Sequence, residues 1–399
     1  MGVTDPSSRQ RLRPAWAEID LDVITTNAAV LTGIVAPAEL CAVVKADGYG
    51  HGAVPVAQAA RRGGATWLGV ALVEEGVELR DAGIDGPILV LSEPTPGAMA
   101  EVVGRDLTPT LYTTTGVEAA VAEVGRSGRR RPLGVHVKVD TGMHRVGAAP
   151  DVAMALALDV AGRAELDLDG FWTHFAVADE VDEPYTADQM SVFDTVSARL
   201  RGAGIIPRWR HAANSAGALW HPGTRLDLVR CGIALYGLAP CSDGVAAPEM
   251  TGLSPALSLR ARVSHVKALD AGERLSYGLR YRLDEPSVVA TVPLGYADGV
   301  PRSLSAAGGE VLIGGRRRRL AGTVTMDQVL VDCGPDPRLG RGPDAGPGPA
   351  VEVGDDVVLL GSQGAEHIGA WEWATLTGTI SYEVVCGISQ RVPRTYLGR

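Results

Sequence analysis

Apolar runs of strand length alternate with helical patterns over the first 240 residues of the chain. The strand-like runs start near Cys41, Thr66, Pro87, Thr108, Leu133, Leu168, Trp209 and Leu226, with helical segments at 73–82, 116–124, 149–161 and 187–203 between them. Continuous apolar runs are typical of parallel strands that are buried on both faces of a sheet. Eight such strands with right-handed crossovers predict a (β/α)8 TIM-type barrel. An open doubly wound sheet fits the same pattern and is the alternative.

The pattern changes after Leu238. Prolines and glycines up to Gly252 are typical of a linker, and short strand-like runs follow at 257–266, 288–292, 310–313, 328–332 and 356–360. We therefore expect a barrel over residues 15–240 and a mainly β domain over residues 241–399. A first strand-like run at 15–21 could belong to either domain. Residues 1 to about 14 are expected to be frayed, and the segment 334–349, rich in proline and glycine, to be a mobile surface loop.

Composition excludes several classes of protein. The 399 residues include 37 Lys and Arg against 47 Asp and Glu, and this net charge of −10 argues against a nucleic-acid-binding protein. The one strong basic run, 316–319, predicts a solvated hairpin. Five cysteines without a CxxC pair favour neither a metal site nor a disulfide framework, and they fit a reducing cytoplasm. Neither a signal peptide nor a membrane-spanning run is evident, so we expect a soluble cytoplasmic protein.

The first candidate for chemistry is Lys45, which directly follows the apolar run Leu40–Val44. Glycines at 48, 50 and 52 predict a turn from this strand into a helix. In parallel α/β proteins such turns lie at the carboxyl edge of the sheet, where active sites are built. A lysine held there against apolar walls can lose its proton and act as a nucleophilic amine. A lysine that caps the strand and reaches water is the alternative.

The segment VVKADGYGHGA, from Val43 to Ala53, resembles the cofactor-binding segment of alanine racemases. In that family the lysine forms an imine with pyridoxal 5′-phosphate. Further motifs similar to those of the family follow in the family's order, so that the resemblance runs from about Ala15 to Tyr396. It implies a pyridoxal-phosphate-dependent isomerase with an N-terminal barrel and a C-terminal β domain.

The resemblance also implies which barrel residues hold the cofactor. Ser215, in HAANSAG, bonds the phosphate together with the backbone amides of Gly232 and Ile233, and Tyr49 and Tyr382 bond it from elsewhere in the chain.

Three more polar residues follow predicted strands or lie in them. By resemblance, Arg145 lies near the phenolic oxygen and assists substrate binding, and His174 lies close to the ring. From the residues alone, a loop salt bridge for Arg145 and a satisfied core histidine for His174 are the alternatives. Lys138, expected in the middle of a strand, matches a lysine that is carbamylated in some family members and pairs with the arginine.

Arg230, in RLDLVRCGIALYG, matches the arginine that faces the pyridine nitrogen. A guanidinium keeps its proton at ordinary pH, so a ring nitrogen that faces it stays an acceptor. The ring is then a weaker electron sink than one opposed by a carboxylate. Fewer side reactions such as transamination are expected, which suits an enzyme that removes and returns one α-proton.

A racemase needs an acid/base group on each face of the substrate. Lys45 can serve one face, and Tyr277, in LSYGLRY, resembles the second base of the family. A tyrosine with an ordinary pKa of about 10 is a poor base, and cations such as Arg230, acting through His174, would lower that pKa. The alternative for Tyr277 is a half-buried strand tyrosine. In the family this residue comes from the second subunit, which implies an obligate homodimer with shared sites.

Two further segments match the family's substrate pocket. Tyr296 is similar to a tyrosine at the substrate entrance, and Met326 and Asp327 match residues near the substrate carboxylate. The commonest family sequence has cysteine where this chain has Thr325.

Together these motifs imply an alanine racemase that supplies D-alanine for peptidoglycan, with Lys45 handling the D-side proton and Tyr277 the L-side proton. Two rivals are a decarboxylase of basic amino acids, which usually has a carboxylate at the ring nitrogen, and a non-catalytic carrier of pyridoxal phosphate, which would be a barrel alone.

Overall fold

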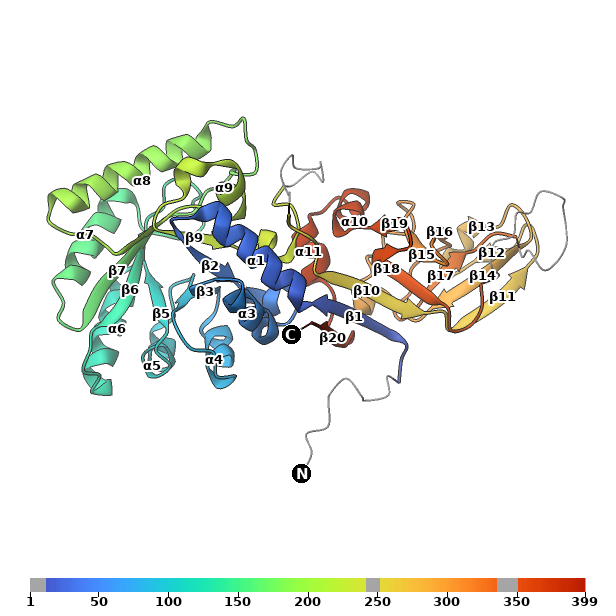
Figure 1. The fold of residues 1–399 in the computed structure, drawn as a ribbon, viewed down its shortest axis with the longest axis horizontal. Coiled ribbons are helices and arrows are strands. Elements are labelled where there is room, and N and C mark those ends of the chain that lie inside the picture. The colour runs from blue at the N-terminus through green and yellow to red at the C-terminus, as the bar shows by residue number, and fades with distance from the viewer. Residues whose placement is uncertain (1–11, 242–251, 336–350, 399) are drawn as a thin grey trace, which may run out of the picture. The chain divides into compact units, whose positions relative to one another are not determined.

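The computed structural model describes residues 12–241, 252–335 and 351–398. They form two compact units: a barrel unit of residues 22–241 with 252–254, and a β unit of residues 12–21, 255–335 and 351–398 (Figure 1). The predictions for residues 1–11, for most of the linker and for loop residues 336–349 lie outside the described residues. No helix in the described ranges is long and apolar enough to cross a membrane.

Eight parallel strands form the barrel unit. They are β2 (Glu39–Val43), β3 (Trp67–Val70), β4 (Ile88–Val90), β5 (Thr108–Leu111), β6 (Leu133–Lys138), β7 (Leu166–Trp172), β8 (Trp209–His211) and β9 (Leu228–Cys231). The hydrogen-bonded order runs from β8 through β7 to β2 and then to β9. Between the ends of this series, the carbonyls of Arg210 and Ala213 accept from the amides of Asp227 and Arg230 at 3.0 and 3.1 Å. The ring is therefore nearly closed. The predicted barrel is confirmed, and the open sheet is wrong.

Helices lie on the outside of these strands (Figure 1). They include α1 (Leu21–Val35), α3 (Ala53–Arg62), α4 (Val73–Asp81), α5 (Met99–Gly104), α6 (Thr114–Ser127), α7 (Pro150–Ala161), α8 (Tyr185–Gly202) and α9 (Ser215–Trp220). The longer helices agree with the predicted segments to within three residues. The six-residue helix α5 was not predicted, because two turns are too short to display a helical period, whereas the small residues and the capping side chain of Asn214 do predict the start of α9.

The β unit is built on a ten-stranded sheet. Its strands are β1 (Ala15–Asp20), β10 (Leu257–Arg262), β11 (His265–Leu269), β14 (Ser287–Val292), β15 (Glu310–Ile313), β16 (Arg316–Leu320), β17 (Val329–Asp332), β18 (Asp356–Gln363), β19 (Glu366–Ile368) and β20 (Arg394–Leu397). A two-stranded arm, β12 (Arg274–Leu275) with β13 (Tyr281–Arg282), and helices α10 (Ala370–Thr377) and α11 (Ser381–Cys386) complete the unit.

Pairing in this sheet answers one open question and corrects one prediction. β1 pairs with β10 and β20, so the strand at 15–21 lies in the β sheet and not in the barrel. The predicted single strand 257–266 is two strands. β10 pairs with β1 and β18, whereas β11 pairs with β14 at one end of the sheet. Alternation alone continues across the break and does not reveal the change of partner.

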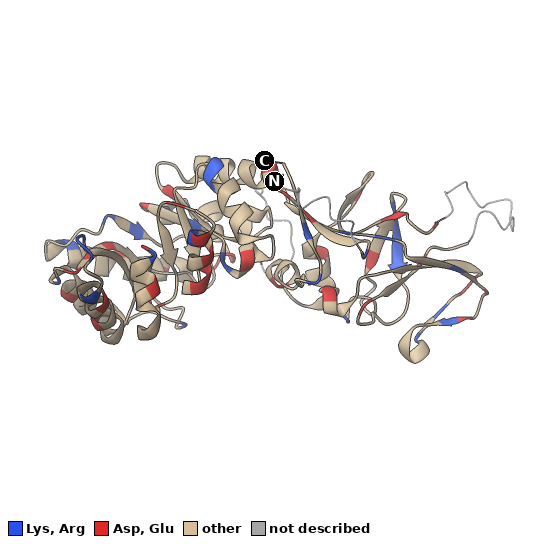
Figure 2. Ribbon diagram, turned by 90° about the horizontal axis from the view of Figure 1, so that it is seen from below, with Lys and Arg blue, Asp and Glu red and all other residues tan. Residues whose placement is uncertain are grey.

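The basic run at 316–319 forms the strand β16, which is blue in Figure 2. β16 and β15 make the predicted hairpin, but β16 also pairs with β17 and so lies within the sheet. Arg317 forms ion pairs with Glu372 at 2.7 Å, Glu310 at 3.0 Å and Glu366 at 3.1 Å. These carboxylates, Glu372 above all, raise the pKa of Arg317. The prediction of a solvated run is therefore wrong for this arginine.

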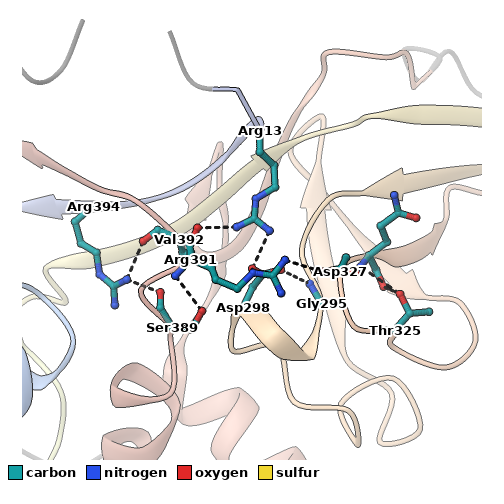
Figure 3. Close-up of polar contacts among 10 residues, drawn as sticks. Arg13, Gly295, Asp298, Thr325, Asp327, Ser389, Arg391, Val392 and Arg394 are labelled. Atoms are coloured by element: carbon teal, nitrogen blue, oxygen red, sulfur yellow. Dashed lines mark hydrogen bonds and ion pairs between the residues drawn. The ribbon is translucent and has the colours of Figure 1, made fainter. Parts of the chain in front are cut away.

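The N-terminal segment is also more ordered than predicted. Arg13 donates to the carboxylate of Asp298 at 2.8 Å and to the carbonyl of Arg391 at 2.9 Å (Figure 3). Asp298 is fully buried, so this ion pair is shielded from solvent on one side. The expectation that the chain is frayed as far as about residue 14 is wrong for Arg13, because its partners lie 285 and 378 residues further along the chain.

The packing of α3 on α1 generates a stability prediction. Gly63 follows α3, and a Cβ at this position would lie 2.4 Å from the carbonyl oxygen of Thr25 and 2.5 Å from the Cβ of Ala28. We expect Gly63→Ala to lower the free energy of unfolding by about 2–4 kcal/mol, because backbone atoms of α1 would have to move. Urea unfolding of purified protein measures the change.

Gly162 provides the matched control. It follows α7 with a similar φ, −85° against −78° at Gly63, and its hypothetical Cβ has no neighbour closer than 3.5 Å. Gly162→Ala should change the free energy of unfolding by no more than about 1 kcal/mol, since it meets no obstacle. Equal unfolding midpoints for the two variants would contradict the packing argument.

Candidate active site

Lys45 is the first residue of α2 (Lys45–Tyr49), two residues after the end of β2 and therefore at the carboxyl end of the barrel. α2 is a left-handed turn, because Ala46, Asp47, Gly48 and Tyr49 all have φ between 51° and 60°. Each non-glycine residue in this conformation costs about 1–2 kcal/mol. The sequence predicts the strand-to-helix turn but not its hand.

Two carboxylates hold this left-handed turn. Asp47 accepts a hydrogen bond from the amide of Ala53 at 2.8 Å. Glu75, in α4 of the next βα unit, accepts from the amides of Ala46 at 2.6 Å and Ala71 at 2.7 Å. Glu75 therefore ties the turn after β2 to the turn after β3, and contacts from outside the turn offset its backbone strain.

Arg230 lies in β9 with 3% of its surface exposed. NH1 contacts Nδ1 of His211 at 2.8 Å, and NH2 contacts the carbonyls of Thr173 and Ala212 at 2.9 Å each and Nδ1 of His174 at 3.2 Å. Within the described residues no carboxylate forms an ion pair with Arg230, and burial lowers its pKa to about 10. The guanidinium is thus a cation at neutral pH, fixed by neutral acceptors.

Trp172 supplies an aromatic wall beside this arginine. The centre of its ring is 4.5 Å from the Arg230 guanidinium carbon, and the ring of His211 stacks on it at 5.2 Å and 8°. A cation over an aromatic face is attracted by the quadrupole of the ring. Trp172 therefore helps to stabilise a charge that has left water.

His174 follows β7 and contacts Arg230 through Nδ1. Burial lowers the pKa of His174 well below its ordinary value, and the charges of Arg230, Arg145, Lys138 and Lys45 lower it further. A neutral imidazole can accept the hydrogen bond from Arg230. The same charges make this end of the barrel positive, which suits an anionic ligand.

Lys138 is the last residue of β6, and not in the middle of the strand as predicted. It is 2% exposed, its Nζ donates to the carbonyl of Val146, and it lies 5.2 Å from the centre of the Trp172 ring. Burial, reinforced by the charge of Arg230, lowers the pKa of Lys138 to about 8.

A second group of polar atoms lies where β8 and β9 end. Asn214 caps α9 through its side chain, and the hydroxyl oxygen of Ser215 accepts from the amides of Gly232 at 2.9 Å and Ala234 at 3.4 Å. A Cβ on Gly232 would lie 2.3 Å from the hydroxyl of Tyr49. Glycine at 232 therefore lets the hydroxyls of Tyr49 and Ser215 approach the same stretch of backbone.

Ile233 begins the short 3₁₀ helix η4 (Ile233–Tyr236) beside this group. The hydroxyl of Tyr236 donates to the carbonyl of Val43 at 3.0 Å, and its ring packs on the rings of Tyr49 at 4.9 Å and His51 at 4.5 Å. These contacts fix the segment after β9 against the end of β2.

Arg145 lies in the loop after β6, and its side chain is exposed. Asp140 shapes this loop by accepting from the amides of Gly142 and His144 at 3.0 Å each. Among the described residues no carboxylate pairs with Arg145, so the alternative of a loop salt bridge is not observed.

Tyr277 lies in the β unit, in the 3₁₀ turn η5 (Tyr277–Leu279) between β12 and β13. It is 74% exposed, which excludes the half-buried strand tyrosine. The hydroxyl of Thr323 donates to the carbonyl of Tyr277 at 2.9 Å, and the hydroxyl of Ser276 donates to the carbonyl of Thr323 at 2.6 Å. The backbone of Tyr277 is therefore anchored while its ring is accessible.

The β unit brings Tyr296 and Met326 together. Tyr296, at the start of η6 (Tyr296–Asp298), donates its amide to the carbonyl of Thr325 at 2.9 Å, and Ala297 donates to the carbonyl of Met326 at 3.0 Å. A Cβ on Gly295 would lie 2.3 Å from the Thr325 carbonyl oxygen, so this contact requires glycine. Tyr296 and Met326 are 43% and 52% exposed.

The neighbouring residues Thr325 and Asp327 have partners of their own. The Thr325 hydroxyl donates to the carbonyl of Gln328 at 2.8 Å, a turn contact that suits threonine where the family commonly has cysteine. Asp327 pairs with Arg391 at 2.6 Å, and Arg391 also reaches Asp298 at 3.5 Å (Figure 3). The Asp327 carboxylate is thus already neutralised within the β unit.

The predicted site residues therefore fall into two groups. The barrel unit holds Lys45, Tyr49, Lys138, Arg145, His174, Ser215, Arg230, Gly232 and Ile233, and the β unit holds Tyr277, Tyr296, Met326, Asp327 and Tyr382. Tyr382 is half-buried at the start of α11. Its expected contact with the same phosphate as Tyr49 stays a prediction.

Sequence reasoning missed His211, Trp172 and Thr173, which surround Arg230. Each lies at or just after the end of a predicted strand, the position at which the other site residues were sought. His136 was also missed, although it lies two residues before Lys138 and therefore on the same face of β6.

Comparison with known proteins identifies the family. Residues 19–240 match the description "Alanine racemase, N-terminal domain" and residues 256–396 match "Alanine racemase, C-terminal domain". An alanine racemase from Symbiobacterium thermophilum is 48% identical over 389 residues, covering 97% of this chain and 98% of the relative.

Two solved structures extend this likeness to the fold. The alanine racemase from E. faecalis is 39% identical with a TM-score of 0.87, covering 96% of this chain and 98% of that one. The alanine racemase from D-cycloserine-producing Streptomyces lavendulae has the same identity and TM-score and covers 98% of both chains. Matches over both units and nearly the full length place this chain in the alanine racemase family of pyridoxal-phosphate-dependent isomerases.

Proposed function

We propose that the chain interconverts L-alanine and D-alanine by a two-base mechanism with Lys45 and Tyr277. The observation that carries this proposal is Arg230, a buried guanidinium fixed by His211, His174 and two carbonyls. A permanent donor at the ring nitrogen favours proton removal and return over chemistry that needs a stronger electron sink. The decarboxylases of the alternative usually have a carboxylate in this place.

The barrel residues fit pyridoxal 5′-phosphate, the cofactor of this family. Ser215 and the amide of Gly232 lie within 2.9 Å of each other at the strand ends, beside the hydroxyl of Tyr49, and they supply the kind of donors that a phosphate needs. The cations that lower the pKa of His174 suit the negative charges of the phosphate and of the phenolic oxygen. Lys45 would hold the aldehyde carbon, and Arg230 would face the ring nitrogen.

When bound, the cofactor withdraws electrons from the α-carbon of the amino acid, so that its α-proton can be removed. The side chains of the protein then decide where protons go. Arg230 holds the ring nitrogen unprotonated, and the amine of Lys45 takes or returns the proton on the D side. The hydroxyl of Tyr277 does so on the L side, and nearby cations, with His174 among the relay groups, lower the cost of its phenolate.

The two units divide the remaining tasks. In this proposal the domain at 15–240, apart from the first strand, binds the cofactor, and the domain at 241–399 supplies Tyr277 together with Tyr296, Met326 and Asp327 for substrate entry and the substrate carboxylate. The exposed ring of Tyr277 on an anchored backbone supports its use by a second subunit. We therefore propose a homodimer in which each site combines residues of both chains.

The proposed product also indicates a cellular role for the enzyme. D-alanine is a building block of peptidoglycan, and we propose that this enzyme supplies it from the cytoplasm.

The first prediction concerns the cofactor and the products. Purified protein given pyridoxal phosphate should show a visible absorbance that borohydride abolishes and that Lys45→Ala lacks, because the covalent link needs the lysine amine. Incubation with L-alanine should yield D-alanine without release of carbon dioxide, measured by chiral chromatography and a gas assay.

Each result separates the proposed enzyme from a rival. Absorbance without D-alanine would indicate a carrier, and carbon dioxide from basic amino acids would indicate a decarboxylase. A colourless wild-type protein would contradict the whole proposal.

The second prediction concerns Tyr277. Tyr277→Phe should lower kcat in both directions by about 10²-fold or more while the cofactor absorbance is retained, because one acid/base group is lost. Mixing Lys45→Ala with Tyr277→Phe subunits under exchange should restore about a quarter of wild-type activity, since half of the dimers would then carry one intact site.

Tyr281→Phe is the matched control, because Tyr281 lies in the same arm but bonds Asp332 at 2.8 Å. It should retain most of the activity. Unchanged turnover in Tyr277→Phe would remove this residue from the mechanism, and no recovery on mixing would remove the shared site.

The third prediction follows from the lowered pKa of Lys138. The folded protein holds this proton less tightly than the unfolded chain does, so the unfolded chain binds more protons between about pH 8 and 10.4. Stability should therefore rise with pH relative to Lys138→Met, by about 2 kcal/mol between about pH 7.5 and 9.5. Urea unfolding at about pH 7.5 and 9.5 in buffer free of carbon dioxide measures the difference.

Lys267, an exposed lysine of β11, provides the control. The stability of Lys267→Met should change with pH in parallel with that of wild type, because this variant keeps Lys138. The neutral amine is also the form that reacts with carbon dioxide. Added bicarbonate should therefore give wild-type protein, but not Lys138→Met, the mass gain of one carboxyl group if Lys138 is carbamylated as proposed from the family resemblance. Parallel pH profiles for wild type and Lys138→Met would contradict the argument.

A further inference from the structure

A row of polar side chains crosses the interior of the barrel behind Arg230. Nδ1 of His211 contacts the arginine at 2.8 Å, and Nε2 of His211 contacts Nδ1 of His136 at 2.9 Å. Nε2 of His136 is 3.9 Å from the carboxylate of Asp169. Both imidazoles are fully buried, whereas the Asp169 side chain is 23% exposed. The row thus joins the site to a carboxylate that reaches solvent.

The chemistry of the arginine gives this row a direction. A guanidinium can only donate, so Nδ1 of His211 must be an acceptor and its proton must be on Nε2. That Nε2–H donates to Nδ1 of His136, so the proton of His136 must also be on Nε2. Burial lowers the pKa of both imidazoles, which keeps them neutral. Every donor in the row therefore points away from Arg230 and toward Asp169.

The end of the row is the point that lacks a partner within the described residues. Nε2 of His136 is a buried donor without a hydrogen-bond acceptor at bonding distance. A buried donor left unsatisfied costs about 1–3 kcal/mol. The Asp169 carboxylate is the charged acceptor that lies nearest to it in the described structure, at 3.9 Å, and this side chain is partly exposed.

Local backbone features place Asp169 and His136 in these positions. The register between β6 and β7 shifts so that Val135 pairs with Leu168 and His136 pairs with Gly170, which leaves Asp169 as a bulged residue. A Cβ on Gly170 would lie 2.4 Å from the His136 ring, so only glycine leaves room for the imidazole. The bulge at Asp169 and the glycine at 170 thus both help to bring Asp169 and His136 close to each other.

The Asp169 end opens on a cavity of about 1000 Å³ that is separate from the strand ends of the site. Its lining includes Trp67 and Pro87, which lie at or before the first residues of their strands, together with Asp106 and Arg208. The charged groups that face His136 are Asp169 and Arg230. The neutral imidazoles of His136 and His211 therefore lie between this cavity and the buried guanidinium of Arg230.

We propose that Asp169 is a positioning residue for Arg230, acting through His136 and His211 as the counter-charge and anchor of the guanidinium. The inference rests on the proposed role of Arg230 at the cofactor ring nitrogen for its effect on the reaction, but the hydrogen bonds that join Arg230, His211 and His136 stand independently of that role. Without the carboxylate, His211 is a weaker acceptor for Arg230, and the guanidinium is held less firmly.

The test compares holoenzyme variants by nitrogen NMR of labelled histidine and arginine. In wild type, His136 and His211 should carry their protons on Nε2 across about pH 6 to 9. Asp169→Asn, which keeps the shape and removes the charge, should shift the ring signals of both histidines and the guanidinium signals of Arg230. Asp167→Asn, in the same strand but with an exposed side chain, should shift none of them.

Kinetics and spectra give a second readout. Asp169→Asn should lower kcat by about 3- to 10-fold, with KM for alanine nearly unchanged, and should shift the visible absorbance of the bound cofactor. Asp169→Glu should recover most of the activity because it restores a carboxylate. His136→Asn keeps an acceptor for His211 but loses the link to Asp169, so it should match Asp169→Asn, and the double variant should lose no more than either single variant.

Distinct outcomes separate this inference from the proposed function. Signals of Arg230 and His211 that do not change in Asp169→Asn, a proton on Nδ1 of either histidine, or additive losses in the double variant would each overturn it. A shift of the Arg230 signals without any change in absorbance or kcat would support the row and overturn the role of Arg230 at the ring nitrogen.

Discussion

The site depends on keeping one permanent cation inside a nearly closed barrel. An arginine can be held there only if its donors are satisfied, because leaving water costs a charged group several kcal/mol. The donors of Arg230 are satisfied by the main-chain carbonyls of Thr173 and Ala212 and by two imidazoles, and an aromatic face lies beside the charge. Among the described residues no carboxylate takes part. The charge is therefore not cancelled by an ion pair in the described part of the chain. A carboxylate at bonding distance would have made the arginine easier to bury and less useful as a partner for a ring nitrogen.

The turn after β2 also depends on contacts from outside it. These contacts hold a strained backbone that gives Lys45 a defined position. A left-handed turn at three residues other than glycine would not persist in an isolated segment, and it is maintained by carboxylates at positions 47 and 75. Because Glu75 also accepts from the amide of Ala71, it joins two consecutive βα turns. In the β unit, the close approach of Gly295 to the Thr325 carbonyl fixes a second pair of loops in a comparable way. Rigid loops on both units are what a reaction needs when a proton must be placed on a chosen face.

The sequence predicts most helices and strands of the fold, but it predicts less well which strands pair and which distant residues contact one another. Each of the eight barrel strands was found, because continuous apolar runs between helical patterns are a local signal. The break at Val263 between β10 and β11, the ordered position of Arg13 and the ion pairs of Arg317 were missed, since each depends on residues far away in the chain. In the site, Lys45 and Arg230 stood out as charges at the ends of apolar runs. His136 and Asp169 did not, because a bulge and a facing glycine are visible only once β6 and β7 are paired.

The pairing of β1 has a consequence for how the chain is made. Ala17 lies beside Leu259 and Arg394 in one sheet, so this strand has partners that are translated long after it. The barrel strands, from Glu39 to Cys231, are complete long before that and pair only with one another. During synthesis the barrel can therefore close while β1 is an unpaired apolar strand, with edges exposed to other nascent chains. The barrel can thus fold while the sheet that carries Tyr277 still lacks β20 (Arg394–Leu397).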